Sequence, residues 1–152
     1  MSQHFCCLGL GGNLGNSLQT LQTAIDTLKE ASILESVEVS RFYITPPLGP
    51  KQPDFTNCVI SGYTAYEPAQ LLKKVQSIEA QEGRSRSQEV RWGPRTLDID
   101  ILLYSDLKLN SADLTIPHPG ILERGFVLLP LKDIHPELMI TDHISLADFE
   151  DS

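Results

Sequence analysis

The 152-residue sequence lacks the features that mark secreted or membrane-spanning proteins. No apolar run reaches 18 residues, so no transmembrane helix is expected. The start of the chain lacks the basic and long apolar regions of a signal peptide, which predicts a cytoplasmic protein. Only three cysteines occur, Cys6, Cys7 and Cys58, all within apolar strings. Their odd number and spacing predict buried free thiols and exclude a disulfide framework or a zinc site.

Basic residues are also scarce, with 12 Lys and Arg against 20 Asp and Glu and a net charge of −8. This balance argues against a nucleic acid or an acidic membrane as partner, because both need an extended basic surface. The basic residues are nevertheless concentrated in one twelve-residue window, which holds Arg84, Arg86, Arg91 and Arg95. An acidic protein with such an arginine cluster is suited to hold a small polyanionic ligand.

The common phosphate-binding and nucleophile motifs are absent as well. There is no GxxxxGK[ST] segment and no GxSxG segment. The glycines at 11 and 12 match neither a P-loop nor a dinucleotide fingerprint. The sequence therefore excludes a Walker-type nucleotide triphosphatase and offers no evident covalent nucleophile.

The apolar pattern alternates between strand and helix periods along the chain. It predicts strands over residues 5–10, 37–44, 55–64 and 97–104, and helices over 17–28, after an Asn16 or Ser17 cap, and 67–83. Two short strand-like pieces at 107–109 and 114–116 precede a helical or irregular segment over 124–134, which contains Pro130. The order β-α-β-β-α-β predicts an α+β, ferredoxin-like split-βαβ sandwich over residues 1–152, a single domain whose antiparallel sheet carries helices on one face.

Asp98 and Asp100 are the clearest chemical signal. Residues two apart on a strand share a face and lie about 6.5–7 Å apart, where two carboxylates repel by roughly 2–3 kcal/mol. Such a pair suits a bound cation, and oxygen ligands favour Mg²⁺ with phosphates. In the alternative reading, both aspartates face solvent while Leu97, Ile99 and Ile101 face the core. The pattern alone leaves these two readings about equally supported.

The arginine cluster directly precedes this strand, and that order favours the first reading. Carboxylates that hold a metal and arginines that hold phosphate are the groups that phosphoryl transfer requires. Three other residues stay ambiguous. Glu79, on the apolar side of its helix, is either a site carboxylate or a residue that reaches water. Trp92 either stacks on a flat ligand or packs its loop, and His118 either contacts phosphate or is structural.

The segment Arg91-Trp-Gly-Pro-Arg-Thr-Leu-Asp-Ile-Asp-Ile-Leu-Leu103 resembles the signature of the 6-hydroxymethyl-7,8-dihydropterin pyrophosphokinases. Five further stretches resemble motifs of the same family: Gly11-Gly-Asn-Leu14, Phe42-Tyr-Ile-Thr-Pro-Pro-Leu-Gly-Pro50, Gln52-Pro-Asp-Phe-Thr-Asn57, Ile116-Pro-His-Pro119 and Arg124-Gly-Phe126. The resemblance spans roughly residues 5–140. It implies a ferredoxin-like fold and transfer of pyrophosphate from ATP to the pterin hydroxymethyl group, with release of AMP, in folate biosynthesis.

The resemblance also implies roles for individual residues. It makes Asp98 and Asp100 the ligands of two Mg²⁺ ions, and Arg84 and Arg95 the phosphate contacts, these four being the catalytic set. The implied ATP-binding residues are Gln76, Arg84, Arg86, Trp92, Arg95, Ile101, Thr115, His118 and Arg124. The implied pterin-binding residues are Thr45, Pro46, Leu48, Phe55, Asn57, Trp92, Asp98 and Phe126, with Phe55 and Phe126 stacking on the ring. Arg91 and Trp92 belong to a loop expected to close over the site, and a monomer is expected.

The sequence departs from the family pattern in two places. Some members carry lysine right after the position of Arg86, where this chain has Ser87 and Gln88 in a loop one residue longer. Some have tyrosine at the positions of Phe55 or Pro119, so hydroxyl contacts are lost here but ring stacking is not. Two other functions stay open from the residues alone: another Mg²⁺-dependent nucleotidyl or phosphoryl transferase, and a ferredoxin-like regulatory module that binds a nucleotide.

Overall fold

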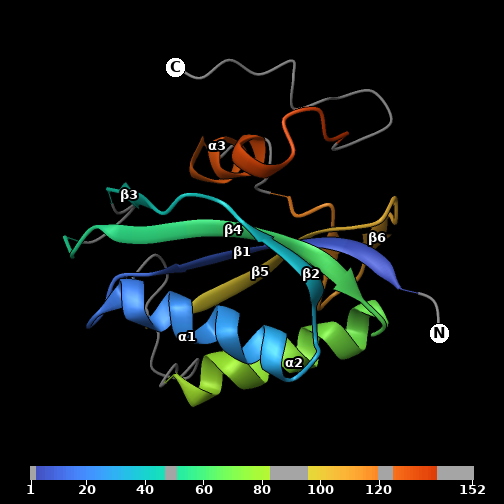
Figure 1. Ribbon diagram of the computed structural model, residues 1–152, viewed down its shortest axis with the longest axis horizontal. Helices are drawn as coiled ribbons and strands as arrows, with labels where there is room; N and C mark the ends of the chain where they lie inside the picture. Colours follow the sequence, from blue (N-terminus) through green and yellow to red (C-terminus); the bar gives the residue numbers. More distant parts are fainter. Residues whose placement is uncertain (1–2, 47–50, 83–95, 120–124, 140–152) are drawn as a thin grey trace.

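A five-stranded antiparallel sheet forms the middle layer of the protein, as the computed structural model shows in Figure 1. The structure describes residues 3–46, 51–82, 96–119 and 125–139, and for residues 125–128 it describes the backbone alone. The main strands are β1 (His4–Gly12), β2 (Glu35–Val39), β4 (Phe55–Thr64) and β5 (Asp98–Tyr104), in the spatial order β2-β4-β1-β5. A short strand, β3 (Tyr43–Thr45), also pairs with β4. This order confirms the predicted ferredoxin-like fold.

Two helices, α1 (Ser17–Glu30) and α2 (Pro68–Gln81), cover one face of the sheet (Figure 1). Asn16 caps α1 by accepting a hydrogen bond from the backbone N–H of Gln19 at 3.2 Å, and Pro68 stands at the start of α2. Both starts agree with the sequence prediction. The helices bury one apolar stripe each against the inward side chains of the strands, and these form the larger core: Leu8, Leu10, Ile60, Ile99 and Ile101 from the sheet, and Leu21, Leu28, Leu71 and Val75 from the helices.

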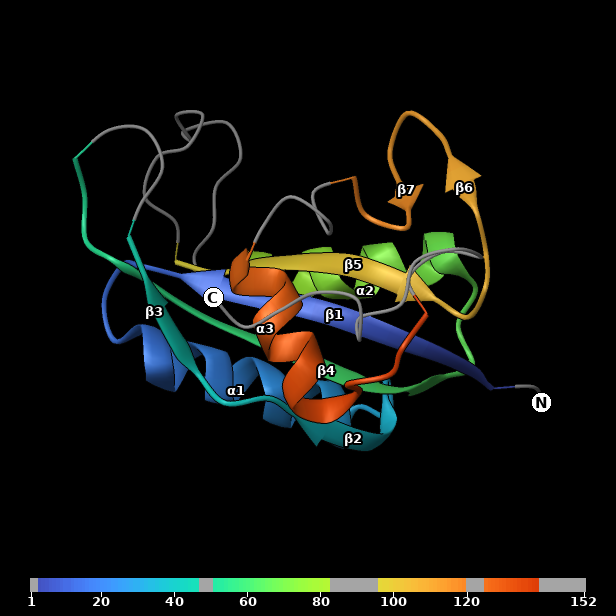
Figure 2. The same ribbon diagram turned by 90° about the horizontal axis from the view of Figure 1, so that it is seen from above.

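The opposite face of the sheet is crossed by a third helix, α3 (Gly125–Ile134), as Figure 2 shows. The sequence predicted helices on one face only and left this segment open between helix and irregular structure. Pro130 lies inside the helix without ending it. Leu131 of α3 packs in a second, smaller core with four sheet residues, Cys7, Val59, Leu102 and Leu103. The sheet is therefore covered on both faces, and α3 shelters part of the face that carries Asp98 and Asp100.

The predicted strand over residues 37–44 is interrupted at Ser40. The backbone N–H of Ser40 donates to the carbonyl of Val59 at 2.9 Å. In return, the N–H of Val59 donates to the Ser40 hydroxyl oxygen, also at 2.9 Å. The hydroxyl thus takes the place of a backbone carbonyl in the ladder, and the chain bends before β3 begins.

A charged network joins β3 to the last turn of α3. The guanidinium of Arg41 donates to both oxygens of Asp133, at 2.7 and 3.2 Å. The hydroxyl of Tyr43 donates to the same carboxylate at 2.7 Å. Burial alone would raise the pKa of Asp133, but the hydrogen bonds from Arg41 and Tyr43 outweigh it and hold this pKa below its usual value. The network fixes the last turn of α3 against Arg41 and Tyr43.

We expect Asp133→Asn to destabilise the protein at neutral pH, because asparagine keeps the shape but loses the charge that Arg41 pairs with. Since the folded-state pKa of Asp133 is lowered, its contribution is present above the unfolded pKa of about 4 and is lost as pH falls through the folded value. The difference in urea midpoint between wild type and variant should therefore shrink below pH 4. Asp26→Asn, on the exposed side of α1, is the matched control. It should change neither the urea midpoint nor the dependence of this midpoint on pH. A pH-independent difference would show that the charge of Asp133 does not matter.

A two-stranded hairpin, β6 (Leu109–Asn110) and β7 (Thr115–Ile116), stands beside β5 and α2 (Figure 2). The backbone N–H of His118, just after β7, donates to the carbonyl of Leu102 at 2.9 Å. The three cysteines are buried and free, as predicted. Burial raises the pKa of the Cys6 thiol to about 12, so it is unreactive at neutral pH. Among the residues described, no helix has the length and apolar character needed to cross a membrane.

Candidate functional site

One row of residues crosses the sheet on the face that α3 partly covers. Gly11 of β1 stands opposite both Asn57 of β4 and Asp98 of β5, and Tyr43 of β3 stands opposite Asn57. Residues directly opposite each other in antiparallel strands share a face. Asn57 and Asp98 therefore project on the same side, two strand spacings or about 10 Å apart. Gly11 between them leaves a floor with no side chain.

Gly11 is required there by the position of Asn57. A Cβ atom at residue 11 would lie 2.6 Å from Oδ1 of Asn57, which is closer than real contacts allow. Asn57 is 8% exposed, and its Nδ2 donates to Oγ1 of Thr45 at 2.6 Å. Phe55, two residues earlier on β4, lies half-buried on the same face. The bare strand, the fixed amide and the ring together suit a flat, polar ligand.

Asp98 and Asp100 lie on this face at the start of β5, and both are half-buried. Ile99 and Ile101 point to the opposite face and belong to the larger core. The alternation therefore follows the predicted period, but the aspartates do not simply face open solvent. Asp100 stands opposite Gly9 of β1, as Asp98 stands opposite Gly11. Each carboxylate thus borders a position without a side chain.

His118 lies beside this pair. Its Nε2 is 3.8 Å from Oδ1 of Asp100, and the side chains are 21% and 33% exposed, respectively. The cis bond between Ile116 and Pro117 precedes it, and its backbone N–H is bonded to β5. The imidazole therefore lies next to the Asp100 carboxylate, and the backbone of His118 is bonded to β5.

Glu79 of α2 is fully buried at 2% exposure, so the reading in which it reaches water is wrong. Its Oε2 accepts a hydrogen bond from the backbone N–H of Ile99 at 2.8 Å. Ile99 stands between Asp98 and Asp100 on the outer strand of the sheet. The helix is thus bonded to the backbone that carries both aspartates.

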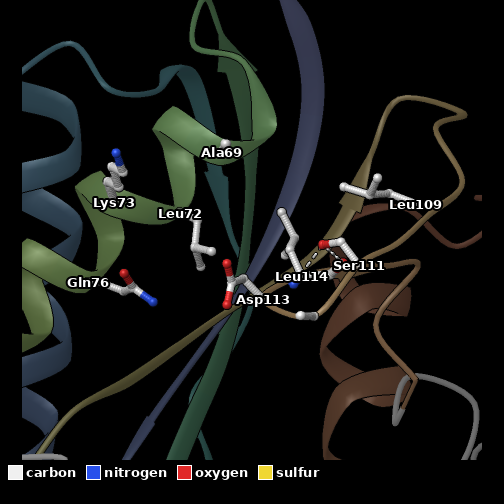
Figure 3. Close-up of a pocket in the computed structure, with 9 residues that line it drawn as sticks. Ala69, Leu72, Lys73, Gln76, Leu109, Ser111, Asp113 and Leu114 are labelled. Carbon is white, nitrogen blue, oxygen red and sulfur yellow. Dashed lines mark hydrogen bonds between the residues drawn. The ribbon is translucent and has the colours of Figure 1, made fainter.

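A pocket of about 520 Å³ lies between α2 and the hairpin (Figure 3). Lys73 and Gln76 line it from α2, and Ser111 and Asp113 from the hairpin. Its apolar wall is formed by Ala69, Leu72, Leu109, Ala112 and Leu114. Apolar walls with a few polar groups are typical of small-molecule sites. Gln76 was a candidate from the sequence, whereas Lys73 and Asp113 were not, because exposed charged residues give no pattern to recognise.

All described candidates except Ile101 fall into three groups. Thr45, Phe55 and Asn57 meet where β3 pairs with β4, and Pro46 follows Thr45 in the chain. Asp98 and Asp100 lie on β5, and His118 lies next to Asp100. Gln76 lines the pocket, Thr115 of β7 adjoins its lining residue Leu114, and Ile101 is buried in the core at 3% exposure. Leu48, Arg84, Arg86, Arg91, Trp92, Arg95 and Arg124 lie outside the described residues, as does the side chain of Phe126 in the first turn of α3.

Asn13 is a buried polar residue whose contacts the sequence did not predict. It is 4% exposed, and its Nδ2 donates to Oε1 of Gln52 at 2.8 Å and to the carbonyl of Pro53 at 2.9 Å. These bonds tie the turn after β1 to the segment that leads into Phe55. Both segments resemble family motifs, which singles them out in the sequence. That they contact each other could not be predicted, because the contact joins residues distant in sequence.

Paired carboxylates at the start of β5 and a pocket between α2 and the hairpin, on a ferredoxin-like sheet, form an arrangement suited to enzymes of phosphoryl transfer. The sequence matches the family of 7,8-dihydro-6-hydroxymethylpterin-pyrophosphokinases (HPPK) over residues 7–136. The chain belongs to this family.

Relatives with the name 2-amino-4-hydroxy-6-hydroxymethyldihydropteridine pyrophosphokinase are similar over most of the chain. The one from Synechocystis sp. is 42% identical over 134 residues, which cover 88% of this chain and 68% of the relative. The one from Pseudomonas aeruginosa is 42% identical over 136 residues, covering 89% and 83%. The one from Haemophilus influenzae is 40% identical over 134 residues, covering 88% and 82%.

Among solved structures, the wild-type HPPK-DHPS of Plasmodium falciparum is similar with a TM-score of 0.73 and 17% identity, covering 97% of this chain and 40% of that one. A triple mutant of the same protein with pteroate gives a TM-score of 0.75 and 16% identity, covering 97% and 41%. The chain thus spans about two fifths of these proteins. At such low identity the likeness shows the fold alone, and it agrees with the architecture described above.

Proposed function

We propose that this protein transfers a pyrophosphoryl group from ATP to the hydroxymethyl oxygen of 6-hydroxymethyl-7,8-dihydropterin and releases AMP. The family supports the reaction class, and the relatives' names support the substrate. The observation that carries the proposal is the row across the sheet, in which a buried amide and a half-buried carboxylate flank the bare floor at Gly11. A flat pterin over Gly11 would have Asn57 at its edge and Asp98 near its reacting substituent.

The aspartate pair fits Mg²⁺ by its donor chemistry. Both side chains offer oxygen only, and both stand on one face at the start of β5. In the described part of the chain, no three His, Cys, Asp or Glu side chains gather into a preformed metal cage. Mg²⁺ commonly takes one or two carboxylates and fills its shell with water and substrate phosphates. Asp98 and Asp100 would thus hold two ions that arrive with ATP and neutralise phosphate charge.

The nucleotide is proposed to occupy the pocket between α2 and the hairpin. Gln76 can donate to and accept from a base, and Leu72 and Leu114 offer apolar surface to it. From this pocket, the phosphates would extend along β5 toward Asp100 and His118. The Nε2 atom of His118 stands 3.8 Å from the Asp100 carboxylate.

By family resemblance, we propose that Arg84, Arg86 and Arg95 hold the phosphates and that Trp92 covers the pterin when its loop closes. Arg124 would add a further phosphate contact, and Phe126 would stack opposite Phe55. Guanidinium groups suit this role because they bind phosphate oxygens in a fork.

In this scheme, the chain acts mainly by positioning and charge balance. Asn57 and Thr45 orient the pterin so that its hydroxymethyl oxygen faces the β-phosphorus of ATP. That oxygen bonds to the β-phosphorus, and the bond from this phosphorus to the oxygen that bridges it to the α-phosphorus breaks. The proton of the pterin hydroxyl passes to solvent water, and AMP leaves with the bridging oxygen. His118, the carboxylates and the arginines keep the reacting groups aligned.

The proposal predicts that ATP and 6-hydroxymethyl-7,8-dihydropterin together yield AMP and a pterin diphosphate in equal amounts. Products should be resolved by chromatography, with ATP alone and pterin alone as controls. Formation of ADP would instead indicate a simple kinase or another phosphoryl transferase. Nucleotide binding with no product would indicate a regulatory binding module. Either result would contradict the proposed reaction.

A further inference from the structure

The buried carboxylate of Glu79 is not explained by packing. It points from α2 into the boundary between helix and sheet, and the residue is 2% exposed. Its neighbours among the buried positions of α2 are Leu71, Val75 and Ile78. Placing a carboxylate in such a boundary costs free energy unless its oxygens are hydrogen-bonded, whereas a leucine of similar size would cost nothing. The residue is therefore suited to a task beyond holding the helix.

One of the atoms that Glu79 binds indicates that task. Its Oε2 accepts from the backbone N–H of Ile99 at 2.8 Å. β5 is the outer strand of the main sheet and pairs with β1 on one side only. The Ile99 N–H thus points away from β1, at the side of β5 where no strand of that sheet continues the ladder. A strand edge without such a partner is free to shift, and Glu79 bonds it between Asp98 and Asp100.

The same helix lines the pocket. Gln76 lies three residues before Glu79, or about one helical turn, and Leu72 and Lys73 lie one further turn away. A second tie holds β5 on the same side, from the N–H of His118 to the carbonyl of Leu102 at 2.9 Å. The pocket helix and the aspartate strand are therefore joined by the Glu79 bond at the point closest to both aspartates.

We propose that Glu79 is a positioning residue, which fixes the backbone between Asp98 and Asp100 and keeps both carboxylates in register with the pocket on α2. This inference rests on the proposed function, in which those carboxylates hold Mg²⁺ and the pocket holds the nucleotide. Glu79 acts through the Ile99 N–H and touches neither substrate. Residues that orient metal ligands in this indirect way typically change metal affinity or activity about 10-fold to 100-fold when replaced.

Three variants of the full chain distinguish the effect of the hydrogen bond from the effects of the charge and of packing. Glu79→Gln keeps an oxygen that accepts from Ile99 but removes the charge. Glu79→Met keeps the length but removes the acceptor. Val75→Ala, at a fully buried position of the same helix, removes packing alone and serves as the control.

We expect E79M to lower kcat about 10-fold to 100-fold and to raise the Mg²⁺ concentration needed for half-maximal rate, with little change in the KM of the pterin. E79Q should keep most of the wild-type rate. V75A should lower stability without changing the Mg²⁺ requirement. An E79M enzyme with wild-type kcat and Mg²⁺ dependence would overturn the proposal. An E79Q enzyme as impaired as E79M would also overturn it, because the charge and not the hydrogen bond would then be what matters.

Hydrogen exchange of the Ile99 amide, measured by NMR without ligands, gives a readout that does not need activity. Relative to the amide of Ile60 in the central strand β4, exchange of Ile99 should be faster in E79M and unchanged in E79Q and V75A. If E79M does not fold, slow exchange of Ile99 in the wild type and in E79Q still supports the tie, and fast exchange in the wild type refutes it. A wild type that forms no AMP would refute the proposed function, whereas the exchange data would still decide whether Glu79 holds β5.

Discussion

Asp98→Asn and Asp100→Asn are each expected to reduce kcat by about 100-fold or more, which is the loss typical of removing one group that stabilises charge in the transition state. Both side chains stand on one face of β5, half-buried, beside glycine positions of β1. Asparagine keeps the volume and an oxygen but lacks the negative charge that binds Mg²⁺. The fold should persist, because the core side of β5 is formed by Ile99 and Ile101.

The measurement is the initial rate of AMP formation at saturating ATP, pterin and Mg²⁺, with circular dichroism to verify folding. Asp106→Asn is the matched control, because Asp106 is an exposed aspartate just after the same strand and should keep the wild-type rate. If either site variant retained most of the rate at saturating Mg²⁺, the assignment of the aspartates as metal ligands would be wrong.

Gly11→Ala is expected to raise the KM of the pterin about 10-fold, which corresponds to one lost hydrogen bond of about 1.4 kcal/mol. The new methyl group would lie 2.6 Å from Oδ1 of Asn57, so the amide must move, and its 2.6 Å bond to Thr45 must break or rotate. The KM of ATP should change little, because the pocket lies on the far side of β5.

Gly9→Ala is a matched control two residues earlier on the same face of β1. Its methyl group would lie 3.4 Å from Cδ1 of Leu102, which borders on an ordinary van der Waals contact. Steady-state kinetics of both variants, with each substrate varied in turn, make the comparison. Equal increases of both KM values in Gly11→Ala would show that the row across the sheet does not distinguish the pterin from the nucleotide.

Much of the fold could be predicted from local sequence patterns. The cap at Asn16, the apolar period of α1 and the proline at the start of α2 all predicted elements that the structure contains. The break at Ser40 was not predictable, because it depends on which backbone N–H the Ser40 hydroxyl meets on β4. The sequence did not decide whether the segment of α3 is helical, because Pro130 disfavours a helix locally. The contacts of Leu131 and Asp133 with the rest of the fold outweigh this tendency.

The candidate site was predictable to a different extent. The two-residue period on β5 predicted that Asp98 and Asp100 share a face, but not whether that face is covered. The structure shows that both side chains are half-buried. The burial of Glu79 stayed open, because the residue lies on the apolar side of its helix but a carboxylate at the end of a helix normally reaches water. The position of the outer strand beside α2 provides one partner, the backbone N–H of Ile99.

The pairing of β5 with β1 determines which sequence changes this enzyme family can tolerate near its aspartates. β5 is held in register by the antiparallel pairs from Asp98 opposite Gly11 to Tyr104 opposite Cys6. A residue inserted before Thr96 leaves these pairs intact, so the preceding arginine segment is free to vary in length between relatives. A residue inserted between Asp98 and Asp100 would turn one carboxylate into the apolar core and one isoleucine out toward the ligand. Length variation should therefore accumulate upstream of Thr96 and stop abruptly at the strand.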